Sequence, residues 1–298
     1  MSKKVQTAVI GSYPIQLYEM EFMRNYFNQT KISWQPYIDQ VVSDMIESGV
    51  DLVSDGQTRD PFIELFARKL KGCRIRARPE IIDSIAFTTP ITVDDQQYLK
   101  KKLPDNIEII GVLTGPYTLT CSCVDLYYHD EKKAAIDFAK ALNKEAVLLQ
   151  KYVNCISFDE PFFSNHFPEY AKELYTIITK DISLPIRLHV CGDVSSIVSD
   201  LLEMPVDMLS HEFKASPKLL ESFNKYTITK DICLGCVRSD HTHVESVQEI
   251  CTHIQKATKV FNDNIVQIAP DCGLRMLPRD IALQKLKNLV QAGEKMYG

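Results

Sequence analysis

The sequence lacks any long hydrophobic run. No uninterrupted apolar stretch approaches the roughly 18 residues that a membrane-spanning helix needs. The segment after Met1-Ser2-Lys3-Lys4 is short and strand-like, whereas a secretion signal would continue into a longer apolar region. An excess of positive charge is also missing, because 39 acidic side chains against 34 basic ones leave a net charge of −5. We therefore expect neither a membrane nor a nucleic acid as partner.

Nucleotide-binding signatures are absent as well. Neither GxGxxG nor GxxxxGK[ST] follows any predicted strand, so the nucleotide-binding α/β folds become less probable. No low-complexity tract or Gly/Ser-rich linker marks a domain boundary. The 298 residues, 45% of them hydrophobic, can form one large core, and we expect a single domain over residues 1–298.

The nine cysteines are odd in number and scattered along the chain. Without a secretion signal, this usage predicts reduced thiols in a cytoplasmic protein. We expect Cys155, Cys233 and Cys251 to be small core residues, because they fall inside predicted strands or helices. Cys121-x-Cys123 is a possible metal pair, but no His or Cys lies near it in sequence, which favours a structural role.

Eight strand-then-helix units follow one another along the chain. Apolar strands alternating with amphipathic helices predict a parallel sheet covered by helices, and eight units in this length favour an α/β fold of the (β/α)8 TIM-barrel type. The irregular stretch 73–105 is interpreted as an insertion with its own hairpin and helix. The expected strands are 5–10, 51–54, 107–113, 155–158, 185–190, 206–210, 230–236 and 265–269; the expected helices are 34–48, 62–70, 132–152, 170–182, 195–202, 218–223, 246–261 and 282–296.

Reactive side chains cluster where these strands end, which is where the active site of such a barrel lies. His189 and Cys191 are two apart on the fifth strand, so they point to the same side, about 6–7 Å apart along the backbone. A nitrogen with a thiolate suits Zn²⁺. Glu212 after the sixth strand and Cys272 after the eighth complete a predicted set of four ligands.

Each of these four residues also has a simpler interpretation. A His-x-Cys pair in a buried strand is often core packing, Glu212 is compatible with an ordinary loop carboxylate, and Cys272 with a half-buried thiol in a turn. Their shared position at strand ends is what favours the metal site.

The same stretches resemble the C-terminal catalytic domain of the cobalamin-independent methionine synthase family. The likeness runs in order along nearly the whole chain, and it is the order of several short motifs that makes it specific. The motifs are Ile10-Gly11-Ser12-Tyr13-Pro14, Asp55-Gly56-Gln57, Gly115-Pro116-Tyr117-Thr118-Leu119, Asp159-Glu160-Pro161, His189-x-Cys191-Gly192, Glu212 and Asp271-Cys272-Gly273-Leu274.

The resemblance implies a zinc enzyme that methylates the thiol of L-homocysteine to form L-methionine. A zinc-bound thiol is deprotonated, and the thiolate is the nucleophilic form. By the same resemblance Ser12 and Gln57 would hold the amino-acid end of the substrate, and Asp159 its ammonium group. The simpler roles are a turn residue for Ser12 and a hydrogen-bond acceptor at the barrel rim for Asp159.

Two departures from the family pattern concern the methyl donor. Full-length members carry a second, N-terminal barrel, whereas this chain begins almost at its first catalytic motif and resembles the short version found in archaea and some anaerobic bacteria. That version is associated with methylcobalamin or a methylated corrinoid carrier protein as donor. In the loop after the seventh strand, the family's folate-protonating histidine falls on Asp240, next to His241, and these two are the catalytic candidates. A corrinoid leaving group needs no such proton, and Gln57 in place of the usual Glu also fits a variant site.

The resulting hypothesis is a methylcobamide:homocysteine methyltransferase. The alternatives are methyl transfer from methyltetrahydrofolate, a zinc-thiol methyltransferase acting on another thiol such as coenzyme M, a metal-free barrel of the uroporphyrinogen decarboxylase type, and an inactive corrinoid- or thiol-binding module. Ser12 together with Asp159 favours homocysteine as acceptor.

Overall fold

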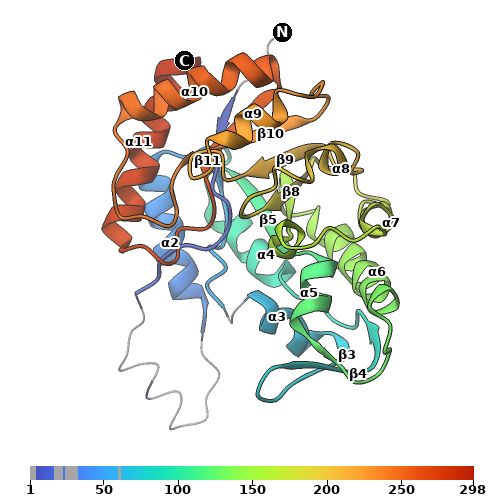
Figure 1. Cartoon of the computed structure of the whole chain (residues 1–298). Coiled ribbons are helices and arrows are strands. Elements are labelled where there is room, and N and C mark those ends of the chain that lie inside the picture. The colour runs from blue at the N-terminus through green and yellow to red at the C-terminus, as the bar shows by residue number, and fades with distance from the viewer. Residues whose placement is uncertain (1–4, 17–22, 24–32, 60–61) are drawn as a thin grey trace.

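In the computed structural model, which describes residues 5–16, 23, 33–59 and 62–298, eight parallel strands form a barrel (Figure 1). Their order is β1-β11-β10-β9-β8-β7-β5-β2, and the bridge between Ala8 and Leu52 joins the two end strands. The predicted (β/α)8 barrel is therefore confirmed. The strands are β1 (Gln6–Thr7), β2 (Leu52–Val53), β5 (Glu108–Thr114), β7 (Cys155–Asp159), β8 (Ile186–Val190), β9 (Met208–His211), β10 (Asp231–Val237) and β11 (Ile265–Pro270).

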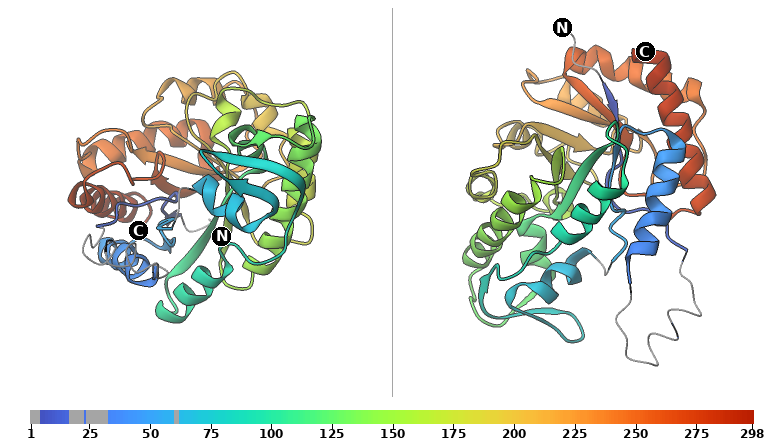
Figure 2. Two further views of the ribbon diagram at one scale, coloured as in Figure 1. Left: turned by 90° about the horizontal axis from the view of Figure 1, so that it is seen from below. Right: turned by 180° about the vertical axis from the view of Figure 1, so that it is seen from behind.

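Helices surround this sheet, as the view along the barrel shows (Figure 2, left). Local sequence explains several of their ends. Gly49 ends α2 in the left-handed conformation, and Ser246 begins α10 with a capping box to Glu249. The surrounding helices are α2 (Gln35–Ser48), α4 (Val93–Lys102), α6 (Glu131–Leu149), α7 (Ala171–Ile178), α8 (Val198–Leu202), α9 (Lys218–Phe223), α10 (Val247–Phe261) and α11 (Arg279–Tyr297).

The insertion contains the expected hairpin and helix. Strands β3 (Lys71–Ile75) and β4 (Pro79–Ala86) pair antiparallel, and α3 (Phe62–Lys69) packs on this hairpin. The helix that follows, α4, packs against α2, α6 and β5 and so belongs to the ring around the barrel. The prediction missed α5 (Pro116–Ser122) and β6 (Val124–Asp125), which pairs with β4 to make a second, three-stranded sheet. A short 3₁₀ helix, η1 (Pro161–Ser164), follows β7, and another, η2 (Asn262–Asn264), precedes β11.

The barrel interior contains a buried cation. Arg187 in β8 is completely buried, and its guanidinium donates to Ser157 Oγ, to Gln267 Oε1 and to the carbonyls of Val9 and Ile10. All five residues of β8 are buried, so the strand reads as a continuous apolar run except at Arg187 and His189. None of the described helices is both long and apolar enough to cross a membrane.

Candidate metal and substrate site

The predicted ligands come from strand ends that are not neighbours in the sheet. His189 lies near the end of β8, Cys191 directly follows that strand, and Cys272 follows β11. Strands β9 and β10 separate β8 from β11 in the sheet. Side chains from these two ends can therefore meet only across the mouth of the barrel.

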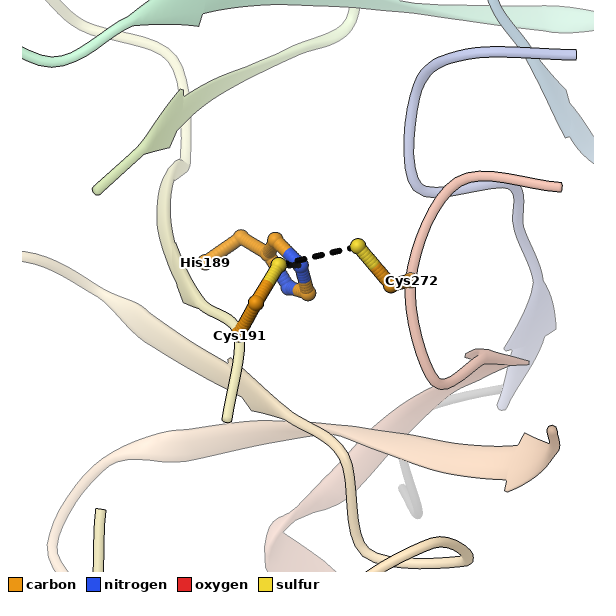
Figure 3. Close-up of side chains that lie close together, drawn as sticks. All are labelled: His189, Cys191 and Cys272. Carbon is orange, nitrogen blue, oxygen red and sulfur yellow. Dashed lines mark hydrogen bonds between the residues drawn. The ribbon is translucent and has the colours of Figure 1, made fainter. Parts of the chain in front are cut away.

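Three of the four predicted ligands do meet there (Figure 3). His189 Nε2 lies 3.0 Å from Cys191 Sγ, and Cys191 Sγ lies 2.9 Å from Cys272 Sγ. All three ligand atoms lie within 4.8 Å of one another. A tetrahedral zinc site with Zn–S bonds of about 2.3 Å needs a sulfur–sulfur distance of about 3.8 Å. The two sulfurs are therefore about 1 Å closer together than a zinc ion between them would hold them.

The surroundings of His189 suit a metal ligand. Its Nδ1 lies 3.0 Å from the hydroxyl of Ser210, which leaves Nε2 directed at the two sulfurs. Burial, together with the charge of Arg187, holds the pKa of His189 well below its ordinary value. The imidazole is thus neutral at physiological pH, which is the form that binds metals.

The thiol of Cys191 is held in its protonated form. Its hydrogen bond with Cys272, followed by burial, raises its pKa well above the usual value. Two thiolates at 2.9 Å would repel each other strongly unless a cation lay between them. The donor set of one neutral imidazole and two closely spaced sulfurs therefore fits a borderline-soft cation such as Zn²⁺.

Glu212 lies outside this group of three in the described chain. It follows β9, and its carboxylate accepts a hydrogen bond from the backbone N–H of Gly192. It is near enough to Cys191 for its charge to contribute to the raised pKa of that thiol. Its assignment as fourth ligand remains a prediction that requires the carboxylate to turn from Gly192 toward the sulfurs.

Ser12 and Gln57 lie on loops that contact the Cys272 loop. The carbonyl of Ser12 accepts a 2.7 Å hydrogen bond from Leu274 N, and a Cβ on Gly273 would come within 2.2 Å of Ser12 Oγ. Gln57 packs against Gly11, where an added Cβ would lie 3.0 Å from its Oε1. The loops after β1, β2 and β11 are thus bound to one another beside the three donors.

Asp159 ends β7 directly opposite His189 of β8 in the sheet register. Burial raises its pKa to about 7, although Arg187 and a 3.0 Å hydrogen bond from Ser157 act in the opposite direction. Its charge also acts on Cys191. A carboxylate in this position can bind a cation close to the sulfurs.

Asp240 and His241 lie on the exposed loop after β10. Asp240 forms two hydrogen bonds of 2.8 and 2.7 Å with the Arg238 guanidinium, and this contact lowers its pKa. It is therefore ionised at neutral pH and has no proton to donate. His241 Nδ1 accepts from the backbone N–H of His243 at 2.9 Å. The charges of Asp240 and Arg238 both act on Glu212, so the loop borders the site.

Two charged residues that the sequence left without a role contact this region. Arg187 lies two residues before His189 in β8, and its charge acts on that imidazole. Glu160 caps α5 by accepting from Tyr117 N, Thr118 N and Thr118 Oγ1 at 3.1, 2.7 and 2.6 Å. A charged residue inside an otherwise apolar strand was the available signal for Arg187. The acceptor role of Glu160 depends on a helix 40 residues earlier in the chain and has no local signal.

Hollows in the molecular surface do not all coincide with this chemistry. A groove of about 870 Å³ between α9 and α10 lies on the outside of the barrel wall. A small pocket lined by Asp55, Gln57 and Arg59 lies at the strand ends instead. The reactive groups, and not cavity size, identify the functional end of the barrel.

Comparison with known proteins covers almost the entire chain. Residues 5–295 match the family model described as the catalytic domain of cobalamin-independent synthase. A methionine synthase from Methanocaldococcus jannaschii is 36% identical, over 96% of this chain and 97% of that protein. One from Methanothermobacter marburgensis is 34% identical, over 97% of this chain and 99% of that protein. The solved structure of a B12-independent methionine synthase from Shewanella sp. W3-18-1, in complex with selenomethionine, has a TM-score of 0.82 at 23% identity, over 98% of this chain and 97% of that one, and it supports the fold.

Proposed function

This chain belongs to the cobalamin-independent methionine synthase family and is a methyltransferase, and we propose that it methylates L-homocysteine at a zinc ion held by His189, Cys191 and Cys272. The observation that carries the zinc proposal is the convergence of these three ligand atoms within 4.8 Å. Glu212 is proposed as the fourth ligand. As the hardest of the four donors, it is the one that an incoming thiol displaces most easily.

Bound zinc would hold the sulfur of the acceptor as a thiolate, the nucleophilic form. The chain's own part is to orient the donors and to bind the rest of the substrate. His189 keeps a fixed ring orientation through its contact with Ser210. A fixed thiolate position favours in-line displacement on the methyl group.

The amino-acid end of homocysteine is proposed to bind Asp159, Ser12 and Gln57. The substrate ammonium group would favour the ionised form of Asp159, whose pKa is raised to about 7 by burial. Ser12 is supported by its contact with Gly273, next to Cys272. Gln57 is supported by its contact with Gly11 on the Ser12 loop.

The methyl donor is the less constrained half of the reaction, and we propose methylcobalamin or a methylated corrinoid carrier protein. Asp240, which is paired with Arg238, is ionised and has no proton for a departing folate nitrogen. A corrinoid leaving group needs none. The family is described as cobalamin-independent and the Shewanella protein as B12-independent, and both descriptions point away from a corrinoid donor. The alternative donor is methyltetrahydrofolate, in which case His241 is the candidate proton donor.

Zinc analysis and a two-donor assay test the proposal together. The purified protein is expected to hold one zinc per chain and to form methionine from homocysteine and one of the two methyl donors. Cys272→Ser should lose zinc and activity, whereas Cys73→Ser in the β3–β4 hairpin should keep both. Full activity in a zinc-free protein would refute the metal assignment. Turnover with methyltetrahydrofolate, and none with methylcobalamin or a methylated corrinoid protein, would refute the donor.

Coenzyme M should be offered as acceptor in the same assay. It has a thiol and an anionic group but no ammonium for Asp159. Preference for coenzyme M over homocysteine would move the assignment to another thiol, with the zinc chemistry unchanged.

A further inference from the structure

Arg275 connects two loops at the mouth of the barrel. It lies three residues after Cys272, and its Nη2 donates to the backbone carbonyl of Gln57 on the loop after β2. Its Nε is buried and has no hydrogen-bond partner within the described residues. Leaving a buried N–H without an acceptor is costly, more so on a charged group, so this atom calls for an explanation.

The charge of Arg275 is also incompletely balanced. Asp55 is the acid whose charge acts on it, but the Asp55 carboxylate is engaged by Gln57 N at 3.0 Å. The neighbouring cation Arg59 has its own partner, because it forms a two-fold ion pair with Asp95. Across the part of the chain that the structure describes, no carboxylate forms a hydrogen bond with Arg275.

The residues around Arg275 are those proposed to bind an amino acid. Gln57 has a left-handed backbone with φ of 48°, which its contacts with Asp55 and Arg275 hold in place. Leu274, the residue before Arg275, donates its N–H to the Ser12 carbonyl at 2.7 Å. A partly buried guanidinium with an unpartnered N–H thus lies against Gln57, on a segment that contacts the Ser12 loop and follows the proposed metal ligand Cys272 by three residues.

We propose that Arg275 binds the α-carboxylate of the amino-acid thiol that this enzyme methylates. The inference rests on the proposed function, because it assumes an amino-acid acceptor. A carboxylate would provide both the missing acceptor for Nε and the missing negative charge, and the planar fork of arginine matches it with two parallel hydrogen bonds. The ammonium group of the same substrate would then bind Asp159. The opposite charges of Arg275 and Asp159 would thus fix the orientation of the acceptor.

Two acceptors that differ only in the carboxylate test this role. L-Homocysteine and 3-aminopropane-1-thiol are each assayed as acceptors with three zinc-loaded forms of the enzyme: the wild type, Arg275→Met and Arg275→Lys. Arg275→Met should raise KM for homocysteine about 10- to 100-fold, the range of a lost charged hydrogen bond, with little change in kcat. It should leave kcat/KM for the aminothiol within about threefold of the wild type, and Arg275→Lys should recover part of the homocysteine affinity.

Product inhibition gives the same comparison without turnover. Methionine should lose affinity for Arg275→Met, whereas 3-(methylthio)propylamine should not. Arg279→Met is the matched control, because Arg279 lies four residues further on and pairs with Asp44 at 2.6 and 2.7 Å. It is expected to lower stability and to leave the ratio between the two acceptors unchanged.

Equal losses on both acceptors would overturn the proposal, because they would show that Arg275 acts only as a clamp on Gln57. An unchanged KM for homocysteine would overturn it as well. Failure of the wild type to methylate homocysteine under any donor is a different result, since it contradicts the proposed function before Arg275 is considered.

Discussion

Replacing Lys285 by methionine should destabilise this protein more than a typical substitution. Lys285 lies in α11 and is completely buried, and its ammonium contacts Glu245 Oε2 at 2.7 Å and the carbonyl of His243. The side chain of Glu245 is only 3% exposed, and its second oxygen accepts from Arg238 N at 2.8 Å. The Glu245 carboxylate therefore joins the two ends of the loop between Arg238 and Glu245, and Lys285 neutralises its charge.

The magnitude follows from what each substitution leaves behind. Methionine has about the length of lysine, so Lys285→Met leaves little cavity. It leaves the buried Glu245 carboxylate without a counter-charge, which should lower the free energy of unfolding by about 3–5 kcal/mol. Glu245→Gln in the same chain removes that charge while an oxygen remains for Arg238 N. Replacing both partners of a buried pair is often nearly neutral, so we expect the double variant to be more stable than Lys285→Met by at least about 2 kcal/mol.

Urea unfolding of the four forms at pH 7 gives the coupling energy of the pair. Lys287→Met is the matched control, because Lys287 lies two residues further along α11 and pairs at 2.7 Å with the exposed Glu47. A surface pair of this kind contributes about 0–1 kcal/mol. Limited proteolysis between residues 238 and 245 should be faster in Lys285→Met than in the control.

A cost below about 1 kcal/mol for Lys285→Met would refute this reasoning. So would a double variant whose loss equals or exceeds the sum of the single losses. Either result would mean that water reaches Glu245 and that the pair does not hold the loop.

Three further predictions concern protons and packing. Zinc binding at pH 7 should release at least one proton, because the pKa of the Cys191 thiol is raised in the metal-free protein. Calorimetry in buffers of different ionisation enthalpy measures the number of protons released, and a value of zero would contradict the prediction. Burial and the charge of Asp95 raise the pKa of Asp55 from 3.8 to about 6, so the folded state binds that proton more tightly. The contribution of Asp55 to stability should then fall by about 3 kcal/mol as pH rises from 3.8 to 6 and stay level above, a slope that Asp55→Asn should lose in paired unfolding curves. Gly115→Ala should cost about 1–3 kcal/mol, because the new Cβ would lie 2.2 Å from the Glu160 carboxyl carbon; an unchanged melting temperature would show that Glu160 moves freely.

Most of the barrel was predictable because its strands are buried on both faces and its helices on one, which gives each a distinct pattern. The strand at β8 was expected over 185–190 and is observed at 186–190. Helix α5 was missed because it is short and starts with a proline after a glycine. Its N-terminal N–H groups are satisfied by Glu160, more than 40 residues away in the chain. No local pattern records such a partner.

The candidate site shows the same division. His189 and Cys191 are close in sequence, and strand alternation alone places them on one face. Their contact with Cys272 spans 81 residues, and the link from Arg275 to Gln57 spans 218. The order of the motifs suggested that the ligands belong to one site. It gave no information on the hydrogen bond between Gly192 N and the Glu212 carboxylate, or on the unpartnered Nε of Arg275.

The sequence by itself determined the kinds of ligand, the fold class and the end of the barrel where chemistry occurs, because residue type and periodicity are local properties. Tertiary structure alone decided which groups meet, which carboxylates remain charged and which donors stay unpaired. Those outcomes depend on the register between strands and on burial, both of which arise only when segments distant in the chain pack together. The identities of the three donors, His189, Cys191 and Cys272, could thus be predicted from the sequence. The 2.9 Å contact between the two thiols could be known only from the folded structure.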